Sequence, residues 1–338
     1  MIAVGVDTHK DSHLAVALDQ LGEVLGELTF AANIKGYNKF IKWSDGLGND
    51  DLVVGIEGAG SWGAGLCETL MKAGRTVFEV ERPSRQDRAR GKSDLIDALA
   101  AAKTVLAGRN LSVPRSRGVR GALAALVVAR SSAVSERTRL HNQIQSLAVT
   151  APAALRERIG SGRGEQLERR LCSMRVQVDV DIETMTVFSV LRDLAKRSRD
   201  LGVTASRYEV EITELVTLID ATLLDECGIG PISAAKLLVC DPRRFRSEQA
   251  FARSNGTAPL EASSGKTVRH RLSRRGDRQV NNAIHIIALT RSVHDEESRA
   301  YIARRISEGK TSREAMRALK RHISRQLYKR ICEIPLTT

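Results

Sequence analysis

Four acidic side chains near the start of the chain stand where short structural segments are expected to end or begin. They are Asp7, Glu57, Asp94 and Asp97. Residues 2–6 and 52–56 are apolar, β-branched runs that predict two buried strands, each followed at once by one of the acids. The two aspartates begin a helical run three residues apart, on one face of its first turn. A chain of this kind must bring two strand ends and a helix start together.

The segments between these acids complete the expected sheet. Residues 13–19 and 23–30 alternate around a turn and predict a hairpin, and residues 76–80 predict a further central strand. Residues 34–43 and 62–73 have helical patterns. A hairpin followed by a strand–helix–strand unit predicts a mixed sheet covered by helices.

Beyond residue 115 the pattern becomes helical. Residues 118–150 and 165–222 predict two long helices that form an antiparallel arm or coiled coil, divided by a loop near Pro152. The alternative is that these helices simply pack on the domain. From residue 223 the texture changes to short helices and glycine-rich turns. We therefore expect three domains: 1–115, 116–222 and 223–338.

The last segment of the chain carries a helix-start signal. Thr311 and Glu314 have the spacing of a capping box, and residues 311–331 predict a basic amphipathic helix.

The charge of the chain is unevenly distributed. Its net charge is +13, yet residues 1–100 carry 11 Lys and Arg against 15 Asp and Glu, and the remainder carries 42 against 25. A basic body predicts a polyanionic partner, and nucleic acid fits best because Lys and Arg neutralise phosphates. An acidic cluster within such a protein predicts Mg²⁺ held against a phosphodiester, because Mg²⁺ prefers carboxylate and water oxygens. For any single acid, the alternative is an ordinary solvated or capping carboxylate.

Cysteines and hydropathy restrict the setting of the protein. The five cysteines have no CxxC spacing and no metal-ligand pattern, which predicts reduced thiols. The chain begins directly in a predicted strand, without the regions of a signal peptide. No apolar run approaches the roughly 20 residues that span a bilayer. We expect a cytoplasmic protein without a membrane partner.

A glycine-rich turn near residue 230 indicates a nucleic-acid contact. Gly228 and Gly230 flank one apolar residue between helical segments, as in a helix-hairpin-helix, where backbone amides approach a phosphate. The alternative is a tight helix–helix turn that needs glycine for its backbone angles.

A second loop combines serines with many cations. Ser263 and Ser264 lie in a segment flanked by Gly and Pro, and the cations that follow are Lys266, Arg269, Arg271, Arg274, Arg275 and Arg278. Cations there stabilise the charge that develops when a hydroxyl attacks a phosphate. From residue types alone, Ser263 fits a turn or phosphate contact better than a nucleophile, because no His or carboxylate is obviously paired with it. The histidines beside the first acid, His9 and His13, fit proton-shuttle, surface or supporting roles.

Several segments, in order along nearly the whole chain, resemble the transposases of the insertion-sequence 110 family. These prokaryotic enzymes are serine recombinases guided by a bridge RNA. The segments are 5–10, 57–63, 91–98, 228–234, Phe245, 256–265 and 275–276. Two departures lie near Glu57, where Ala59 and Trp62 replace the usual hydroxyl residue and tyrosine.

The resemblance implies a fold of the α/β plus all-α class. Its parts are a RuvC-like (ribonuclease-H-like) domain, a helical coiled-coil arm and a small helical transposase domain with a helix-hairpin-helix. It also implies that the four acids bind Mg²⁺ and that Ser263 attacks DNA to form a covalent phosphoserine link. Ser263 is favoured over Ser264 because it falls four residues after Pro259. The implied partners are donor DNA, target DNA, a guide RNA and further copies of the chain, from dimer to tetramer.

Two other functions remain open at this point. A RuvC-like Holliday-junction endonuclease would use the same acids without a covalent intermediate. A non-catalytic nucleic-acid-binding protein would need no acids, and the intact set of four argues against it.

Overall fold

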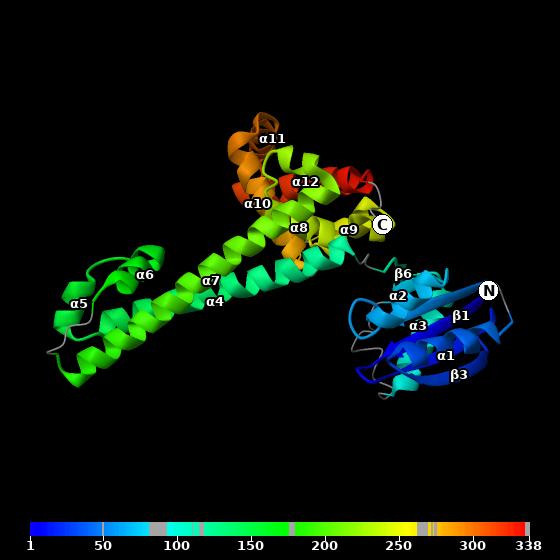
Figure 1. Ribbon diagram of the computed structural model, residues 1–338. Helices are drawn as coiled ribbons and strands as arrows, with labels where there is room; N and C mark the ends of the chain where they lie inside the picture. Colours follow the sequence, from blue (N-terminus) through cyan, green and yellow to red (C-terminus); the bar gives the residue numbers. More distant parts are fainter. Residues whose placement is uncertain are drawn as a thin grey trace. The chain divides into compact units, whose positions relative to one another are not determined.

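The computed structural model describes residues 1–48, 51–80, 93–109, 111–114, 118–175, 180–261, 270–271, 273 and 276–334 (Figure 1). The chain divides into two compact units, Met1–Ser116 with Asp241–Phe251, and Arg117–Cys240 with Ala252–Thr338. The three domain boundaries expected from the sequence stay a prediction. Among the described residues, none of the helices combines the length and apolar character needed to cross a membrane.

The first unit contains a mixed sheet with strand order β3-β2-β1-β4-β5-β6. Its strands are β1 Ile2–Thr8, β2 Ser12–Leu18, β3 Val24–Ala31, β4 Leu52–Glu57, β5 Thr76–Val80 and β6 Leu111–Ser112. Strand β4 pairs in parallel with β1 on one side and with β5 on the other, and the other pairings are antiparallel. The mixed sheet and its hairpin are as the sequence predicted, and they are consistent with a RuvC-like domain.

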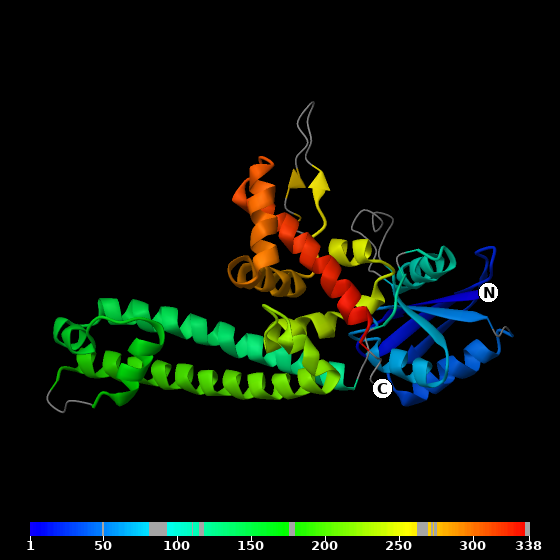
Figure 2. The same ribbon diagram turned by 90° about the horizontal axis from the view of Figure 1, so that it is seen from above.

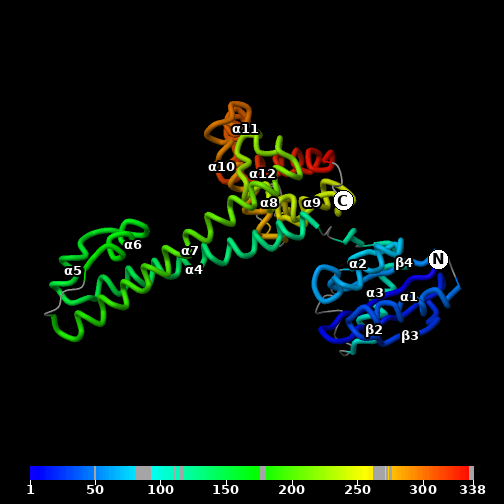
Figure 3. Tube along the Cα trace, viewed as in Figure 1, coloured from blue at the N-terminus to red at the C-terminus, as the bar shows by residue number. Residues whose placement is uncertain are grey.

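Helices cover both faces of this sheet (Figures 2 and 3). Helices α1 (Ile34–Asp45) and α2 (Ala64–Lys72) share one apolar core with Val4 and Val6 of β1. Helix α3 (Asp94–Leu106) packs on the opposite face, against Ala3. Side chains alternate between faces along a strand, so the two helical layers take alternate residues of β1.

A segment distant in sequence completes the first unit. It contains η3 (Pro242–Arg244) and the start of α9 (Glu248–Ser254). The Arg244 guanidinium pairs with Glu79 of β5, and its Nε donates to the Val113 carbonyl at 2.7 Å. Residues 241–251 therefore belong with the sheet rather than with the helices on either side of them.

In the described part of the second unit, the regular elements are helices and one short ribbon of β7 (Leu260–Glu261) and β8 (His270–Arg271). Its helices are α4 Val119–Thr150, α5 Ala153–Ile159, α6 Gly164–Ser173, α7 Ile182–Asp220, η2 Ala221–Asp225, α8 Pro231–Cys240, α10 Arg278–His294, α11 Glu296–Ser307 and α12 Ser312–Cys332. Helices α4 and α7 run side by side, and α5 and α6 pack near one end of the pair (Figures 1 and 2). The long helical hairpin was expected, and its coiled-coil geometry stays a prediction. The Thr311–Glu314 capping box at the start of α12 is confirmed.

The second long helix begins later than its pattern predicted. Residues from 165 were expected to belong to one helix, but α6 ends at an extended Met174 and α7 begins only at Ile182. The Asp181 side chain caps α7 by accepting from the Thr184 amide at 2.9 Å. No Gly or Pro marks residues 174–181, so the interruption had no strong signal in the sequence.

A buried carboxylate ties α6 to both long helices. Glu168 of α6 accepts hydrogen bonds from Arg137 at 3.3 Å and from Ser198, and it lies 2.8 Å from the His141 Nε2. Burial opposes ionisation of Glu168, but these partners outweigh burial and lower its pKa below the usual 4.5. The ionised side chain is therefore stabilised where α4, α6 and α7 meet.

We expect Glu168→Gln to destabilise the helical hairpin by about 3 kcal/mol, because a buried ion pair loses one member. The folded pKa is depressed, so the stabilisation is present above pH 4.5 and is lost as the pH falls through the folded value. Urea unfolding followed by circular dichroism at neutral and acid pH measures both effects. Exposed Glu157 of α5 offers a matched control, and Glu157→Gln should change stability by less than about 0.5 kcal/mol. Equal effects of the two substitutions would contradict the assignment.

Candidate metal centre

Two neighbouring parallel strands place the first two acids together. Strands β1 and β4 pair in register through Val6 and Ile56, and Asp7 and Glu57 are the next residues of each strand. Both acidic residues are 5% exposed. The period of two along a strand puts them on the face that α3 covers. The Thr8 hydroxyl donates to the Glu57 carbonyl at 2.7 Å and links the two strand ends.

The other two acids arrive on helix α3. Ser93 caps the helix by accepting from the Ile96 amide at 3.3 Å, so Asp94 and Asp97 fall in its first turn. This helix lies directly on β1 at Gly5, where an added Cβ would come within 2.1 Å of the Ala102 nitrogen. Only a residue without a Cβ allows this approach. The missing side chain brings the helix start to the strand end that carries Asp7.

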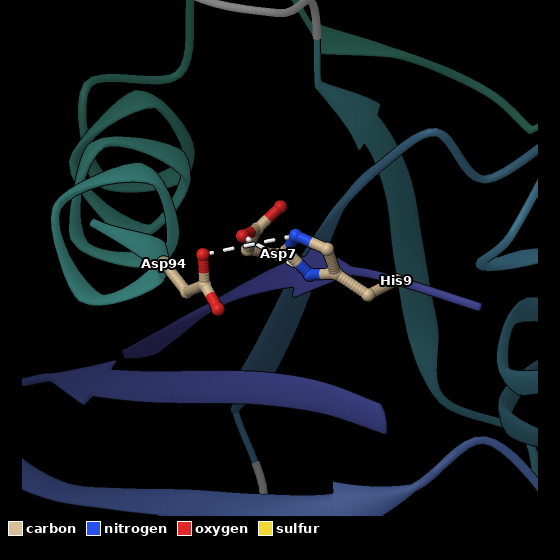
Figure 4. Close-up of side chains that lie close together, drawn as sticks. All are labelled: Asp7, His9 and Asp94. Atoms are coloured by element: carbon tan, nitrogen blue, oxygen red, sulfur yellow. Dashed lines mark ion pairs between the residues drawn. The ribbon is translucent and has the colours of Figure 1, made fainter. Parts of the chain in front are cut away.

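A histidine joins Asp7 to Asp94 (Figure 4). The His9 Nδ1 lies 3.6 Å from Asp7 Oδ2, and its Nε2 lies 3.7 Å from Asp94 Oδ1. One ligand atom from each of the three residues falls within 4.8 Å of the others. His9 is therefore part of the acidic site, and its position two residues after Asp7 was the only sign of this in the sequence.

Electrostatics connect all four predicted acids. Burial raises the pKa of Asp7 above 3.8, and the charges of Glu57, Asp97 and Asp94 raise that pKa further, while His9 opposes them. The three other carboxylates thus lie near enough to Asp7 to disfavour its charge. A site that gathers carboxylates at this energetic cost fits a hard divalent cation, because the cation offsets their mutual repulsion.

The second histidine does not belong to the site. His13 is 1% exposed, and its ring stacks on Tyr37 at a centroid distance of 5.9 Å and meets Phe30 edge-on at 5.4 Å. Burial lowers the pKa of His13 and favours the neutral ring. Its role is to fill the apolar core beneath the sheet.

The predicted nucleic-acid contacts are only partly described. Gly228 has a positive φ of 83°, and an added Cβ would approach the Ile287 carbonyl of α10 to 3.0 Å, so it serves a close packing contact. Nothing lies within 4 Å of a Cβ added at Gly230. Arg271 in β8 and Arg278 at the start of α10 are exposed. The remaining predicted residues lie outside the described part of the chain: Ser263, Ser264, Lys266, Arg269, Arg274 and Arg275.

We expect Gly5→Ala to cost about 2–3 kcal/mol, because the added methyl meets the backbone of α3. The displaced helix should also weaken stabilisation by Mg²⁺. Thermal unfolding with and without Mg²⁺ measures both. The matched control is Gly26→Ala in β3, where the nearest atom to the added Cβ is 3.7 Å away in the Trp43 ring. That variant should behave like the parent, and a Gly5→Ala protein that also does so would refute the contact.

Asp7→Asn should raise the unfolding temperature at neutral pH in a chelator. The folded pKa of Asp7 is raised, so its ionisation destabilises the fold as the pH rises from 3.8 through the folded pKa, and the amide removes that effect. Mg²⁺ should stabilise the parent and leave Asp7→Asn nearly unchanged, because a ligand stabilises only the state that binds it. Exposed Asp11 supplies the control Asp11→Asn, which should respond to Mg²⁺ like the parent. Equal responses in all three proteins would exclude a metal at Asp7.

Two family models match the chain and between them cover more than half of it. A transposase model of the DEDD type of IS110 matches residues 4–151, which include all four acids. A model of the transposase IS116/IS110/IS902 family matches residues 221–303. No curated protein matches the chain. The chain therefore belongs to the IS110 family of transposases.

Proposed function

We propose that this transposase cuts and rejoins DNA through a covalent link to Ser263, with Mg²⁺ bound by Asp7, Glu57, Asp94 and Asp97. The observation that carries the proposal is the convergence of these carboxylates on Asp7, where two strands and a helix start meet. Membership of a transposase family supplies DNA as the substrate and an enzymatic function.

The acidic site has the donors for a hard divalent ion. It offers carboxylate oxygens from three elements and one imidazole, with Asp7 and Glu57 buried and Asp94 exposed at the edge. Mg²⁺ bound here would supply charge stabilisation at the oxygens of a phosphodiester. The buried pair would hold it, and exposed Asp94 would face the substrate. His9 lies between two of these carboxylates and would orient them.

The proposed chemistry conserves the phosphodiester bond energy. The Ser263 Oγ forms a bond to phosphorus and gives its proton to water, while the bond from phosphorus to one sugar oxygen breaks and that oxygen takes a proton from water. A hydroxyl from a second strand then attacks the same phosphorus, the bond between phosphorus and the Ser263 Oγ breaks, and the proton of the attacking hydroxyl passes through water to Ser263. The strand is rejoined to a new partner instead of being hydrolysed, as transposition requires.

The proposal extends to the partners of the enzyme. Exchange between a donor and a target needs two duplexes, so we infer a homo-oligomer, from dimer to tetramer. We further propose that a guide RNA selects the target sequence. The turn at Gly228 and Gly230, as a helix-hairpin-helix, and the cations around Ser263 would contact the DNA backbone. The basic balance of residues 101–338 supports polyanion binding by this part of the chain.

Ser263→Ala should lower formation of a denaturant-resistant protein–DNA adduct by more than about a thousandfold, because the nucleophile is lost. Labelled DNA incubated with protein, Mg²⁺ and guide RNA, then separated under denaturing conditions, measures the adduct. The neighbouring Ser264→Ala is the matched control and should retain it.

The same assay separates the other functions. Continued DNA cutting by Ser263→Ala without an adduct would favour a RuvC-like junction endonuclease. DNA binding by the parent without an adduct or cutting, unchanged by Asp7→Asn or by removal of divalent ions, would favour a non-catalytic nucleic-acid-binding role.

A further inference from the structure

A pocket of about 300 Å³ lies within the second unit, between α11, α12 and the segment that leads into β7. Six of its lining residues are cations: Arg271, Arg305, Lys310, Arg317, Lys320 and Arg321. Among the described lining residues the one carboxylate is Glu314, which caps α12 with Thr311 and lies 3.9 Å from Arg317, and Arg305 pairs with Glu308 outside the lining. The cations still outnumber these carboxylates, so the pocket is electropositive and suited to an anion.

One of these cations is buried at the pocket wall. Lys320 is 8% exposed, and its Nζ donates to the Asn281 Oδ1 at 2.8 Å. Within the described residues, Lys320 pairs with no carboxylate. Burial lowers its pKa, since the ammonium loses solvent without gaining an opposite charge. A buried ammonium that has lost solvent without gaining an opposite charge is complementary to a phosphate that enters the pocket.

A hydrogen-bond network holds this wall in place. The Asn281 Nδ2 donates to the Asn255 carbonyl at 2.6 Å. The Asn255 Oδ1 in turn accepts from the Thr257 amide at 3.0 Å and from its hydroxyl at 2.6 Å. Thr257 and Lys320 both line the pocket. The polar groups that would meet a ligand are thus positioned before it binds.

Part of the pocket wall is apolar, and the volume of the pocket limits which ligands fit. Ala258, Pro259, Ala318 and the ring of Tyr301 line it. About 300 Å³ is at the lower end for ligand pockets. A double helix is far too wide to enter, and a base inside a duplex is stacked between its neighbours. The pocket suits a single nucleotide that has left the stack, with an apolar face and one phosphate.

We propose that this pocket binds one unpaired nucleotide of a DNA strand, with its phosphate at Lys320 and its base against the apolar wall. This inference rests on the proposed function, from which it takes DNA as the ligand. It adds that the DNA strand is unpaired where it enters the pocket. Pro259 of the pocket wall is four residues before Ser263 in the sequence. A nucleotide held here would therefore belong to the strand that the proposed nucleophile acts on.

The test uses the full chain and fluorescent oligothymidine, with fluorescence anisotropy at fixed salt. Lys320→Met keeps the buried stem and removes the charge, so affinity should fall about tenfold. Lys329, an exposed lysine of α12 outside the pocket, offers the matched control Lys329→Met, which should stay within about twofold of the parent. Equal losses in both variants would overturn the pocket in favour of diffuse charge attraction.

A second variant fills the pocket without changing charge. Ala318→Leu should weaken oligothymidine binding several-fold and leave binding of a blunt duplex hairpin unchanged. Circular dichroism checks that both pocket variants fold. If Lys320→Met does not fold, the binding result of Ala318→Leu alone tests the pocket. Equal effects on single strand and duplex would overturn the unpaired nucleotide. If the pocket variants weaken binding of oligouridine RNA but not of oligothymidine, the assignment of the nucleotide to DNA is overturned.

The binding result is independent of the covalent chemistry. In a Ser263→Ala background, the pocket variants should show the same fold-changes in oligothymidine affinity as in the parent. If the parent protein forms no adduct but the pocket variants still weaken oligothymidine binding, only the serine mechanism is rejected. A normal adduct with no pocket effect would reject the pocket alone.

Discussion

The close packing of helix α3 on strand β1 is the contact on which the candidate metal centre depends. At Gly5 the helix backbone occupies the space that a Cβ would fill, so no side chain separates the two elements. The start of α3 therefore reaches the end of β1, and Asp94 faces Asp7 across His9. Parallel pairing of β1 with β4 adds Glu57 at the same edge. One missing side chain thus lets Asp94 approach Asp7 and His9, with Glu57 and Asp97 near enough to raise the pKa of Asp7.

Two buried charged side chains of the helical unit, Glu168 and Lys320, have different surroundings. Glu168 is surrounded by Arg137, His141 and Ser198, and its ionised form is favoured. Among the described residues, Lys320 donates to the amide oxygen of Asn281 and pairs with no carboxylate, and burial lowers its pKa. The first arrangement is complete within the protein and holds three helices together. The second lacks an opposite charge at a pocket wall, which is the physical basis for assigning it a phosphate.

Local patterns in the sequence predicted much of the first unit and of the acidic site. Apolar β-branched runs identified β1 and β4, and the spacing of Asp94 and Asp97 marked the start of α3. The break before Ile182 was missed because no Gly or Pro accompanies it. The return of Asp241–Phe251 to the first unit was missed because the pairing of Arg244 with Glu79 is a contact between distant residues. Lys320 could have been noticed as a charge among the buried positions of α12.

Residue types at short and regular spacings were enough to predict most of the helices and strands, the four acids and the family. Only the tertiary structure decided that the carboxylates converge on Asp7, that His9 joins them and that His13 does not. The same structure places Lys320 buried at a pocket wall, where it pairs with no carboxylate of the described residues. These facts depend on distances between residues far apart in the chain. Local periodicity specifies which face of an element is apolar, whereas packing specifies which faces meet.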